Sequence, residues 1–167
     1  MMNTSDSAMN WRRQLATALR QRPWVMKPLL RAYRWTRPKW TLGVVGIVFN
    51  DRREVLLVEH VLHPHHPWGL PGGWVDAREA PIVSVARELH EEVALTVEVG
   101  PLIQVEQIAE IQHLDFAFLC YAPPPYAITA LSPELLDFGW HPVDSLPHID
   151  PFHHRSILSA YEQISRE

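Results

Sequence analysis

The chain has 167 residues, of which 47% are hydrophobic and 20% charged, and its formal net charge is −4. This composition is typical of a globular protein, and the single cysteine, Cys120, excludes an internal disulfide. No apolar run approaches the length that spans a bilayer, and no signal-peptide core follows the N-terminal basic residues, so we expect a cytoplasmic protein.

The first part of the chain carries a strong positive charge. Residues 11–40 contain nine Lys or Arg residues and no acid, whereas residues 41–167 contain six basic against 18 acidic residues, a net charge of −12. We therefore divide the chain into a basic, Trp-rich helical extension over 1–40 and a main domain over 41–167. Apolar residues three and four apart predict helices over 10–22 and 25–35.

The basic extension has several candidate roles. Residues 11–40 could lie on an anionic membrane surface. They could instead pack against the acidic main domain or against a second subunit, which would make a homodimer, and we slightly prefer packing of this kind. We predict no specific nucleic-acid partner.

Strands and helices are interspersed along the main domain. The Val- and Ile-rich residues 41–49, a polar turn and the apolar residues 55–60 predict a β-hairpin. The following loop is rich in Pro, Gly and His, and we expect it to be irregular. Further predicted elements are a helix over 81–94, strands near 97–109, 114–122 and 135–142, and a last helix capped by Asp150 with Pro151 at its first position. This order predicts an α/β fold of the α+β type, with a mixed β-sheet between helices.

The helix predicted over 81–94 has two different faces. Glu88 meets Glu91 and Glu92 on one face, because residues three and four apart are neighbours on a helix surface. Like charges at this spacing destabilise a helix, and a divalent cation such as Mg²⁺, which prefers carboxylate oxygens, reverses that effect. Alone, such a cluster is most often only a solvated surface. The apolar stripe on the other face consists of Ile82, Val85, Ala86, Leu89 and Val93.

Residues upstream of the acidic cluster favour the metal-site interpretation. Gly73 is followed after five residues by Glu79, and Glu79 is followed after seven residues by the run RELHEEVAL. The run WGLPG precedes Gly73. This pattern resembles the Nudix box of the Nudix hydrolases at every charged position. The order of elements from about 41 to 165 is also similar to that family's domain, so we expect a Nudix-like mixed sheet between helices.

The residues at the two ends of the predicted helix are not the ones that best stabilise a helix end. Ala94 stands where the family pattern has Gly, at the end of the helix, where the chain often turns into a left-handed conformation. Ala80 precedes Pro81 where Ser, Thr or Asp would cap the helix better. Each costs about 1 kcal/mol of stability, and neither removes an expected ligand.

The resemblance implies a reaction and a cofactor. Nudix hydrolases typically cleave a phosphoanhydride in a nucleoside diphosphate linked to another group, by attack of water on phosphorus with Mg²⁺ or Mn²⁺. By the same resemblance, Glu88 and Glu92 are expected metal ligands, and Glu91 is a third ligand or the base. A backbone carbonyl of Gly72 or Gly73 is expected to complete the coordination, since Gly permits close approach.

Other residues are expected to support this chemistry. By resemblance, Arg87 and Glu79 orient the carboxylates. Some family members use an acid outside the box as the base, and Glu134 is our candidate, ahead of Glu110 and Asp115. For each of these three acids, an ordinary surface position is the simpler interpretation.

Aromatic and His residues near the glycines are candidates for substrate binding. Trp68 and Trp74 could stack on a base, and packing is an equal alternative. His66, with His63 and His65, could contact phosphate, whereas a solvated loop is the simpler interpretation.

Two functions from different classes remain at this stage. The first is a Nudix hydrolase acting on a small nucleotide-type pyrophosphate. The second is a Nudix-fold domain that binds a nucleotide without cutting it. The intact carboxylates Glu88, Glu91 and Glu92 favour the enzyme, because binding domains of this type often lose them.

Overall fold

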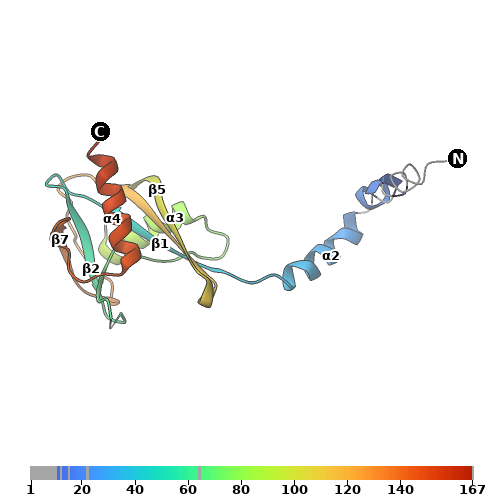
Figure 1. The fold of residues 1–167 in the computed structure, drawn as a ribbon, viewed down its shortest axis with the longest axis horizontal. Coiled ribbons are helices and arrows are strands. Elements are labelled where there is room, and N and C mark those ends of the chain that lie inside the picture. The colour runs from blue at the N-terminus through green and yellow to red at the C-terminus, as the bar shows by residue number, and fades with distance from the viewer. Residues whose placement is uncertain (1–10, 12, 15, 22, 64, 167) are drawn as a thin grey trace. The chain divides into compact units, whose positions relative to one another are not determined.

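The computed structural model describes residues 11, 13–14, 16–21, 23–63 and 65–166. The chain divides into two compact units, Met1–Lys39 and Trp40–Glu167, which are described separately below. Figure 1 shows the elements of each unit along the chain.

A four-stranded mixed sheet forms the centre of the second unit. Strand β1 (Thr41–Val48) lies between β4 (Gly72–Trp74) and β6 (His113–Tyr121), and β5 (Glu98–Ile108) forms the other edge. β1 pairs with β6 in parallel and with β4 in antiparallel orientation. The mixed sheet and interspersed helices confirm the predicted fold class.

The main domain contains a second sheet that the sequence did not predict. β2 (Glu54–His60) pairs with β3 (Trp68–Gly69) and with β7 (Leu135–Pro142), and all three are antiparallel. The predicted hairpin of β1 and β2 is therefore wrong as a paired ladder, since only one bridge, Phe49 to Val55, joins the chain around the turn. The two strands part because each buries both of its faces in the core.

Alternating side chains of β1 and β2 divide the core into two clusters. Val44 and Val48 belong to a cluster with α3 (Pro81–Val93), whereas Val45 and Ile47 belong to one with α4 (Pro151–Ile164). This alternation follows from the two-residue period of a strand. The two helices therefore cover opposite faces of the four-stranded sheet.

Helix ends match their sequence signals. The side chain of Asp150 accepts a 2.7 Å hydrogen bond from the backbone N–H of Phe152, which confirms the predicted cap of α4. Strands β5, β6 and β7 lie within one residue of the predicted ranges. A short 3₁₀ helix, Ala109–Ile111, connects β5 to β6.

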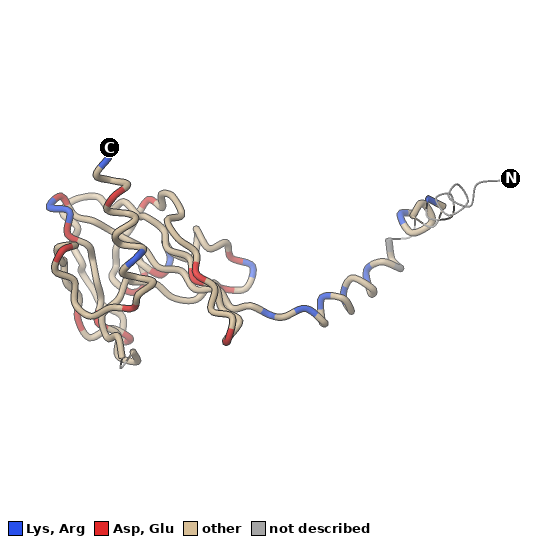
Figure 2. Tube along the Cα trace, viewed as in Figure 1, with Lys and Arg blue, Asp and Glu red and all other residues tan. Residues whose placement is uncertain are grey.

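The first unit contains α2 (Pro23–Trp35), which includes Pro28 inside the helix. Helix also extends over the described residues between 11 and 20, and Gln21 forms a turn. The remaining positions of the predicted 10–22 helix lie outside the described residues. Blue Lys and Arg positions recur along this unit, while acidic positions occur on the second unit (Figure 2). In the described part of the chain, no helix is both long and apolar enough to cross a membrane.

Candidate active site

Helix α3 packs closely against strand β1 of the central sheet. Val85, Leu89 and Val93 are fully buried. A Cβ added at Gly46 of β1 would lie 2.5 Å from Cδ1 of Leu89, so only glycine lets the helix approach this closely. The packed apolar stripe confirms the predicted orientation, although Ile82 at its N-terminal end is exposed.

The ends of α3 show the two departures noted in the sequence. Ala80 makes no side-chain cap, and Pro81 occupies the first helical position. Ala94 adopts the left-handed conformation with φ 54° and ψ 28°, and its N–H reaches the carbonyl of His90. The Ala therefore takes the backbone shape that the Gly of the family pattern favours.

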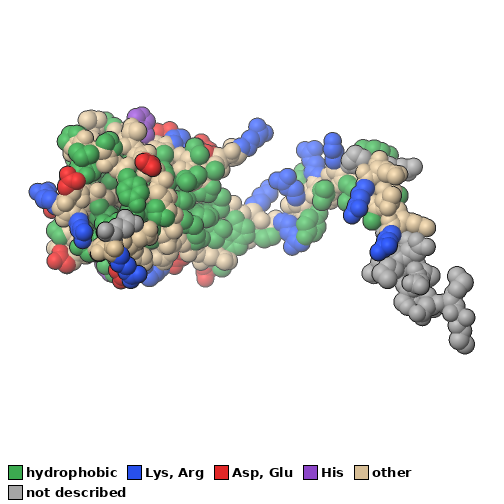
Figure 3. All heavy atoms as spheres, turned by 90° about the horizontal axis from the view of Figure 1, so that it is seen from above, with side chains coloured by type: hydrophobic (Ala, Val, Ile, Leu, Met, Phe, Trp, Pro, Cys, Tyr) green, Lys and Arg blue, Asp and Glu red, His purple; other side chains and the backbone are tan. Residues whose placement is uncertain are grey.

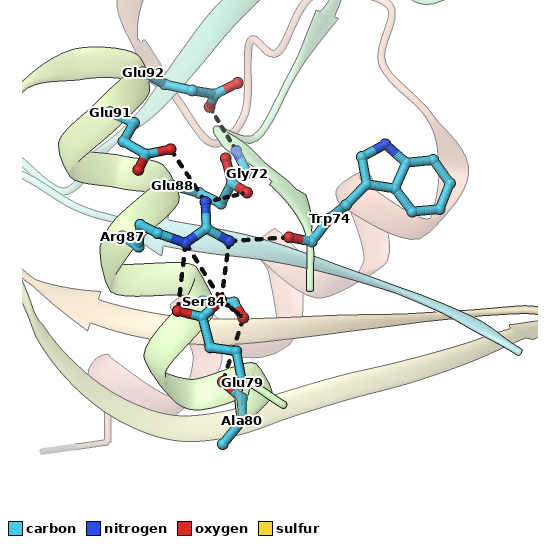
Figure 4. Close-up of polar contacts among 9 residues, drawn as sticks. All are labelled: Gly72, Trp74, Glu79, Ala80, Ser84, Arg87, Glu88, Glu91 and Glu92. Atoms are coloured by element: carbon cyan, nitrogen blue, oxygen red, sulfur yellow. Dashed lines mark hydrogen bonds and ion pairs between the residues drawn. The ribbon is translucent and has the colours of Figure 1, made fainter. Parts of the chain in front are cut away.

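Arg87 is the centre of a network of charged hydrogen bonds (Figure 4). Its Nη1 donates to Oε1 of Glu88 at 2.9 Å and to Oε2 of Glu91 at 3.1 Å. Its Nη2 donates to Oε2 of Glu79 at 3.0 Å and to the backbone carbonyl of Trp74 at 3.1 Å. One guanidinium thus connects the loop before α3, the helix and strand β4, as its rigid planar set of donors permits.

Glu79 is held from two sides. Arg87 donates to Glu79 from one side, and the hydroxyl of Ser84 donates a 2.6 Å hydrogen bond to Oε2 of Glu79 from the other. The hydrogen bonds from Arg87 and Ser84 hold the pKa of Glu79 below its ordinary value. In return, the Glu79 carboxylate raises the pKa of Arg87, with smaller contributions from Glu88 and Glu91. Glu79 and Arg87 are therefore ionised partners that fix the start of the helix.

Glu92 lies in the core instead of on a wet helix face. Only 6% of the residue is exposed, and its Oε2 accepts a 2.7 Å hydrogen bond from the N–H of Gly72. Burial raises the pKa of Glu92 to about 8, aided by the charges of Glu88 and Glu134. Burial likewise raises the pKa of Glu88 above its ordinary value. At Glu88 the effect of burial outweighs the ion pair with Arg87, and at Glu92 it outweighs the hydrogen bond from Gly72, so a further positive charge would favour the ionised form of both.

The site can be tested for its fit to a divalent cation. The donors are hard carboxylate oxygens of the type that Mg²⁺ and Mn²⁺ prefer. A Cβ at Gly73 would lie 2.6 Å from the carboxyl group of Glu88, so the glycine makes room for that carboxylate beside β4. The donor chemistry and the burial of the Glu88 and Glu92 carboxylates fit such a cation.

The carboxylates of the site are not arranged as a complete set of metal ligands. Within the described ranges, no group of three or more acidic, His or Cys side chains is arranged to hold a metal ion. Nη1 of Arg87 binds one oxygen of Glu88, Oε1, and one of Glu91, Oε2. The guanidinium thus leaves the second oxygen of each carboxylate for a cation.

A cavity of about 610 Å³ lies next to the carboxylate site. Gly72 and Gly73 line it and also contact the carboxylates, so one stretch of backbone separates the two. Trp74 shows the same division, because its carbonyl faces Arg87 while its ring points away from the network (Figure 4). A group bound in the cavity would therefore lie close to the carboxylates.

Polar groups on β6 support one wall of this cavity. Nε2 of His113 lies 2.8 Å from Oδ1 of Asp115, and its Nδ1 lies 2.8 Å from Oγ1 of Thr41. The Trp74 ring contacts the His113 ring edge-on, with centroids 5.0 Å apart. The wall thus combines an exposed indole face with a carboxylate acceptor.

Two histidines at another side of the cavity are kept neutral. Burial lowers the pKa of His153 to about 4 and that of His60 to about 4. Nδ1 of His153 accepts a hydrogen bond from the N–H of Leu70 at 3.2 Å, so the proton of the neutral ring lies on Nε2. Neutral imidazoles contribute hydrogen bonds there without a positive charge.

The predicted residues outside the box divide into two groups. Glu134 lies just before β7 on the segment whose Ser132 N–H binds the Glu92 carbonyl, so it belongs to the carboxylate side. Asp115, Trp68 and Trp74 line the cavity, as do His63, His65 and His66. Glu110 lies on the 3₁₀ helix and does not line this cavity.

Several cavity residues carried no sequence signal for this role. They are Glu106, His113, Asp150, His153 and Arg155. They come from β5, from β6 and from the start of α4, and Arg155 of α4 pairs with Glu106 of β5 at 2.9 Å. Only the folded chain brings them together.

Comparisons with known proteins agree with this arrangement. The model of the NUDIX domain matches residues 39–161. The chain is 30% identical over 124 residues to the 8-oxo-dGDP phosphatase NUDT18 of Mus musculus, which covers 71% of this chain and 37% of that protein. It is 28% identical over 103 residues to a MutT-like protein of Streptomyces ambofaciens, covering 62% of this chain and 64% of that protein. The chain thus spans less than two thirds of the length of both relatives.

A solved structure supports the same fold. An ADP-ribose pyrophosphatase from Streptococcus suis superposes with a TM-score of 0.63 at 22% identity, covering 77% of this chain and 94% of that chain. The family model spans most of the chain, including the entire carboxylate network. The chain therefore belongs to the Nudix hydrolase family.

Proposed function

We propose that this chain is a Mg²⁺- or Mn²⁺-dependent pyrophosphohydrolase that cleaves a phosphoanhydride bond in a nucleotide-type substrate. The observation that carries the proposal is the Gly72–Glu92 contact. It places the most buried carboxylate of α3 against the glycine backbone that also lines the cavity. A substrate in that cavity would present its pyrophosphate at the acidic edge.

Charge explains the need for a cation. A pyrophosphate is strongly anionic, and Glu88, Glu91 and Glu92 repel it unless positive charge lies between them. Glu88 and Glu92 would hold the cation, with Glu91 as a third ligand and a carbonyl of Gly72 or Gly73 nearby. A bound divalent cation supplies positive charge against the pyrophosphate and activates water for attack on phosphorus.

Arg87 and Glu79 act as positioning residues in this proposal. Glu79 receives the Arg87 Nε and Nη2 donors, which leaves Nη1 directed at Glu88 and Glu91. This arrangement aligns two carboxylates while keeping the guanidinium fixed to β4 through the Trp74 carbonyl.

The base for the attacking water is Glu91 or Glu134. Glu91 is more than half exposed and is held by Arg87, whereas Glu134 is an exposed acid whose charge reaches Glu92. Glu134→Gln should lower kcat and change the pH–rate profile if Glu134 takes the proton. An unchanged profile assigns that role to Glu91.

The cavity would bind the remaining part of the substrate. Its volume of about 610 Å³ lies in the usual range of small-molecule sites. The Trp74 ring offers a stacking surface, and Trp68 and His66 line the cavity as further contacts. The mouse relative is named for 8-oxo-dGDP, and the Streptococcus suis structure is named for ADP-ribose. Both compounds contain a pyrophosphate joined to a nucleoside.

A substrate panel with a sensitive readout tests the proposal. The full chain is incubated with 8-oxo-dGDP, ADP-ribose and nucleotide sugars in Mg²⁺ or Mn²⁺, and the phosphorylated products are measured. We expect turnover of at least one compound, and its loss in chelator. Glu88→Gln and Glu92→Gln should abolish turnover in a folded protein, while Glu162→Gln on the exposed face of α4 should not.

The result can distinguish an enzyme from a binding domain. Near wild-type turnover in folded Glu88→Gln or Glu92→Gln would contradict the site assignment. Tight binding of a panel compound without product, under both metals, would contradict the proposed hydrolysis and favour a nucleotide-binding domain.

A further inference from the structure

Helix α2 exposes a large apolar surface. Leu29, Leu30 and Tyr33 are each more than half exposed, and with Met26 they occupy helix positions i, i+3, i+4 and i+7, which share one face. Trp24 and Trp35 expose indole rings on the opposite side of the helix, with Trp35 80% exposed. None of the residues of this unit whose burial is described is buried, so the face of Leu29, Leu30 and Tyr33 is not covered by a core among them.

Basic side chains form a separate row on the same helix. Lys27, Arg31 and Arg34 stand at i, i+4 and i+7, so they lie along one side of α2. Arg37 follows the helix, with its guanidinium 4.2 Å above the centre of the Tyr33 ring. Figure 3 shows basic and hydrophobic side chains interleaved on this unit.

These cations surround a common hollow at the end of α2. Its basic lining consists of Lys27, Arg31, Arg34, Arg37 and Lys39. Leu30 and Trp35 provide apolar lining in the same hollow. Among the described residues, none of the five cations has a carboxylate ion-pair partner. The hollow therefore combines unbalanced positive charge with apolar surface.

We propose that α2 and the residues to Lys39 bind the surface of a membrane that contains anionic lipid. A helix of 13 residues is too short to span a bilayer, so it would lie in the interface. The face of Leu29, Leu30 and Tyr33 enters the boundary between headgroups and acyl chains, and the Lys and Arg side chains on its flank reach the anionic headgroups. The lipid headgroup is the anion that the hollow binds.

Both features of the surface argue for this occupant. A nucleic acid would use the cations but leave the exposed Leu29 and Leu30 side chains without a role. A second α2 helix packed on the apolar face would bring two basic helices together without opposite charge. An anionic bilayer satisfies both the charge and the apolar surface.

Vesicle binding tests the proposal. The full chain is mixed with vesicles of phosphatidylcholine alone or with phosphatidylglycerol added, at low and high salt, and the bound fraction is measured by flotation. We expect binding only to the anionic vesicles, weakened by salt. Removing three interfacial cations, Lys27→Gln, Arg31→Gln and Arg34→Gln together, should lower the partition constant on the order of 100-fold.

A control with the same change in net charge makes the test specific. Arg52→Gln, Arg53→Gln and Arg166→Gln remove three exposed basic residues from the second unit, and this variant should bind as the wild type does. Leu29→Ala with Leu30→Ala should weaken binding without changing charge, because both side chains belong to the apolar face. Circular dichroism of each variant verifies that its helix content is unchanged.

Several results would overturn the proposal. They are absence of binding to anionic vesicles at low salt, equal binding by the α2 charge variant and the wild type, or equal loss in both charge variants. Light scattering that shows a dimer dissociated by Leu30→Asp, with no vesicle binding, would assign the face to a second copy. Binding of an oligonucleotide through the same cations, with no vesicle binding, would assign it to nucleic acid. Turnover of a nucleotide substrate is measured separately, because the proposed function does not depend on this surface.

Discussion

The backbone N–H of Gly72 donates a 2.7 Å hydrogen bond to Oε2 of Glu92, and this contact joins α3 to β4 inside the core. A carboxylate in such a position is costly when ionised, because burial disfavours charge. The same carboxylate is therefore a source of instability without a cation and a strong ligand with one.

Glu92→Gln should stabilise the metal-free protein at neutral and alkaline pH. The folded-state pKa of about 8 lies far above the ordinary pKa of a glutamate, about 4.5, so the folded chain retains a proton that the unfolded chain releases. That contribution is complete below about pH 4.5 and is lost as pH rises toward about 8, at about 1.4 kcal/mol per pH unit. Gln cannot ionise, so it avoids this loss.

Thermal melts in chelator at several pH values measure this effect. The Tm of Glu92→Gln should be higher than that of the wild type, and the difference should grow as pH rises from about 5 to about 8, between the unfolded and the folded pKa of Glu92. The exposed Glu98→Gln is the control and should show no such trend. A Tm difference that is independent of pH would contradict the raised pKa.

Gly73→Ala should lower activity by displacing the Glu88 carboxylate. The new Cβ would lie 2.6 Å from the Glu88 carboxyl group, and that group, at the end of a flexible side chain, would move before the backbone does. We expect a folded protein with a near-normal Tm, a higher requirement for Mg²⁺ and a kcat lowered about 10- to 100-fold. A Mg²⁺ titration of initial rates measures it, and an unchanged titration would show that Glu88 is not needed in its present position.

Ala94→Gly should stabilise the protein without changing its activity. Ala94 has a φ of 54°, where an L side chain is strained and glycine is not. We expect a gain of about 1 kcal/mol in the free energy of unfolding, measured with denaturant. The matched substitution Ala86→Gly, inside α3, should instead lose about 1 kcal/mol. Losses in both variants would contradict the strain at Ala94.

Acid should destabilise the fold through His60 and His153. The pKa of each is lowered from 6.5 to about 4 by burial, so the unfolded chain binds protons that the folded chain rejects. Their stabilising contribution is present above about pH 6.5 and is lost as pH falls toward about 4. NMR titration of the ring resonances should locate both pKa values directly.

The variant His153→Gln separates this effect from general acid unfolding. Gln keeps an acceptor for the Leu70 N–H but does not titrate. The slope of unfolding free energy against pH should decrease by up to about 1.4 kcal/mol per pH unit between the two pKa values. An identical slope in the variant would show that His153 is not a source of the acid sensitivity.

Trp74→Ala should weaken substrate binding more than chemistry. The ring is 62% exposed beside the cavity, so its loss costs little packing, and the backbone carbonyl that binds Arg87 remains. We expect KM to rise with kcat changed little, because stacking acts alike on substrate and transition state. Steady-state kinetics on a substrate from the panel measure the split, and a fall in kcat alone would argue against stacking.

Local sequence signals predicted much of this protein. The spacing of Val85, Leu89 and Val93 indicated the buried face of α3, and Asp150-Pro151 indicated the start of α4. Helix periodicity is short-range, and capping depends on adjacent residues, so both can be derived without tertiary contacts. The run from Gly73 to Leu95 also identified the family, because its charged residues stand at fixed distances.

Pairing of the strands could not be derived in the same way. A polar turn between two apolar runs predicts a hairpin, yet β1 and β2 enter different sheets. Alternating buried residues on both faces of each strand are compatible with either arrangement. The choice depends on which distant strands, β6 and β7, cover the remaining edges.

The sequence by itself determined the family, the central helix and which carboxylates that helix carries. The tertiary structure alone decided that Glu92 is buried against Gly72 while Glu91 remains exposed, although the two are neighbours in the sequence. It also brought His60, Asp115 and His153 to one cavity from three separate elements. Burial and convergence depend on contacts between residues far apart in the chain, and a local pattern contains no information about those distances.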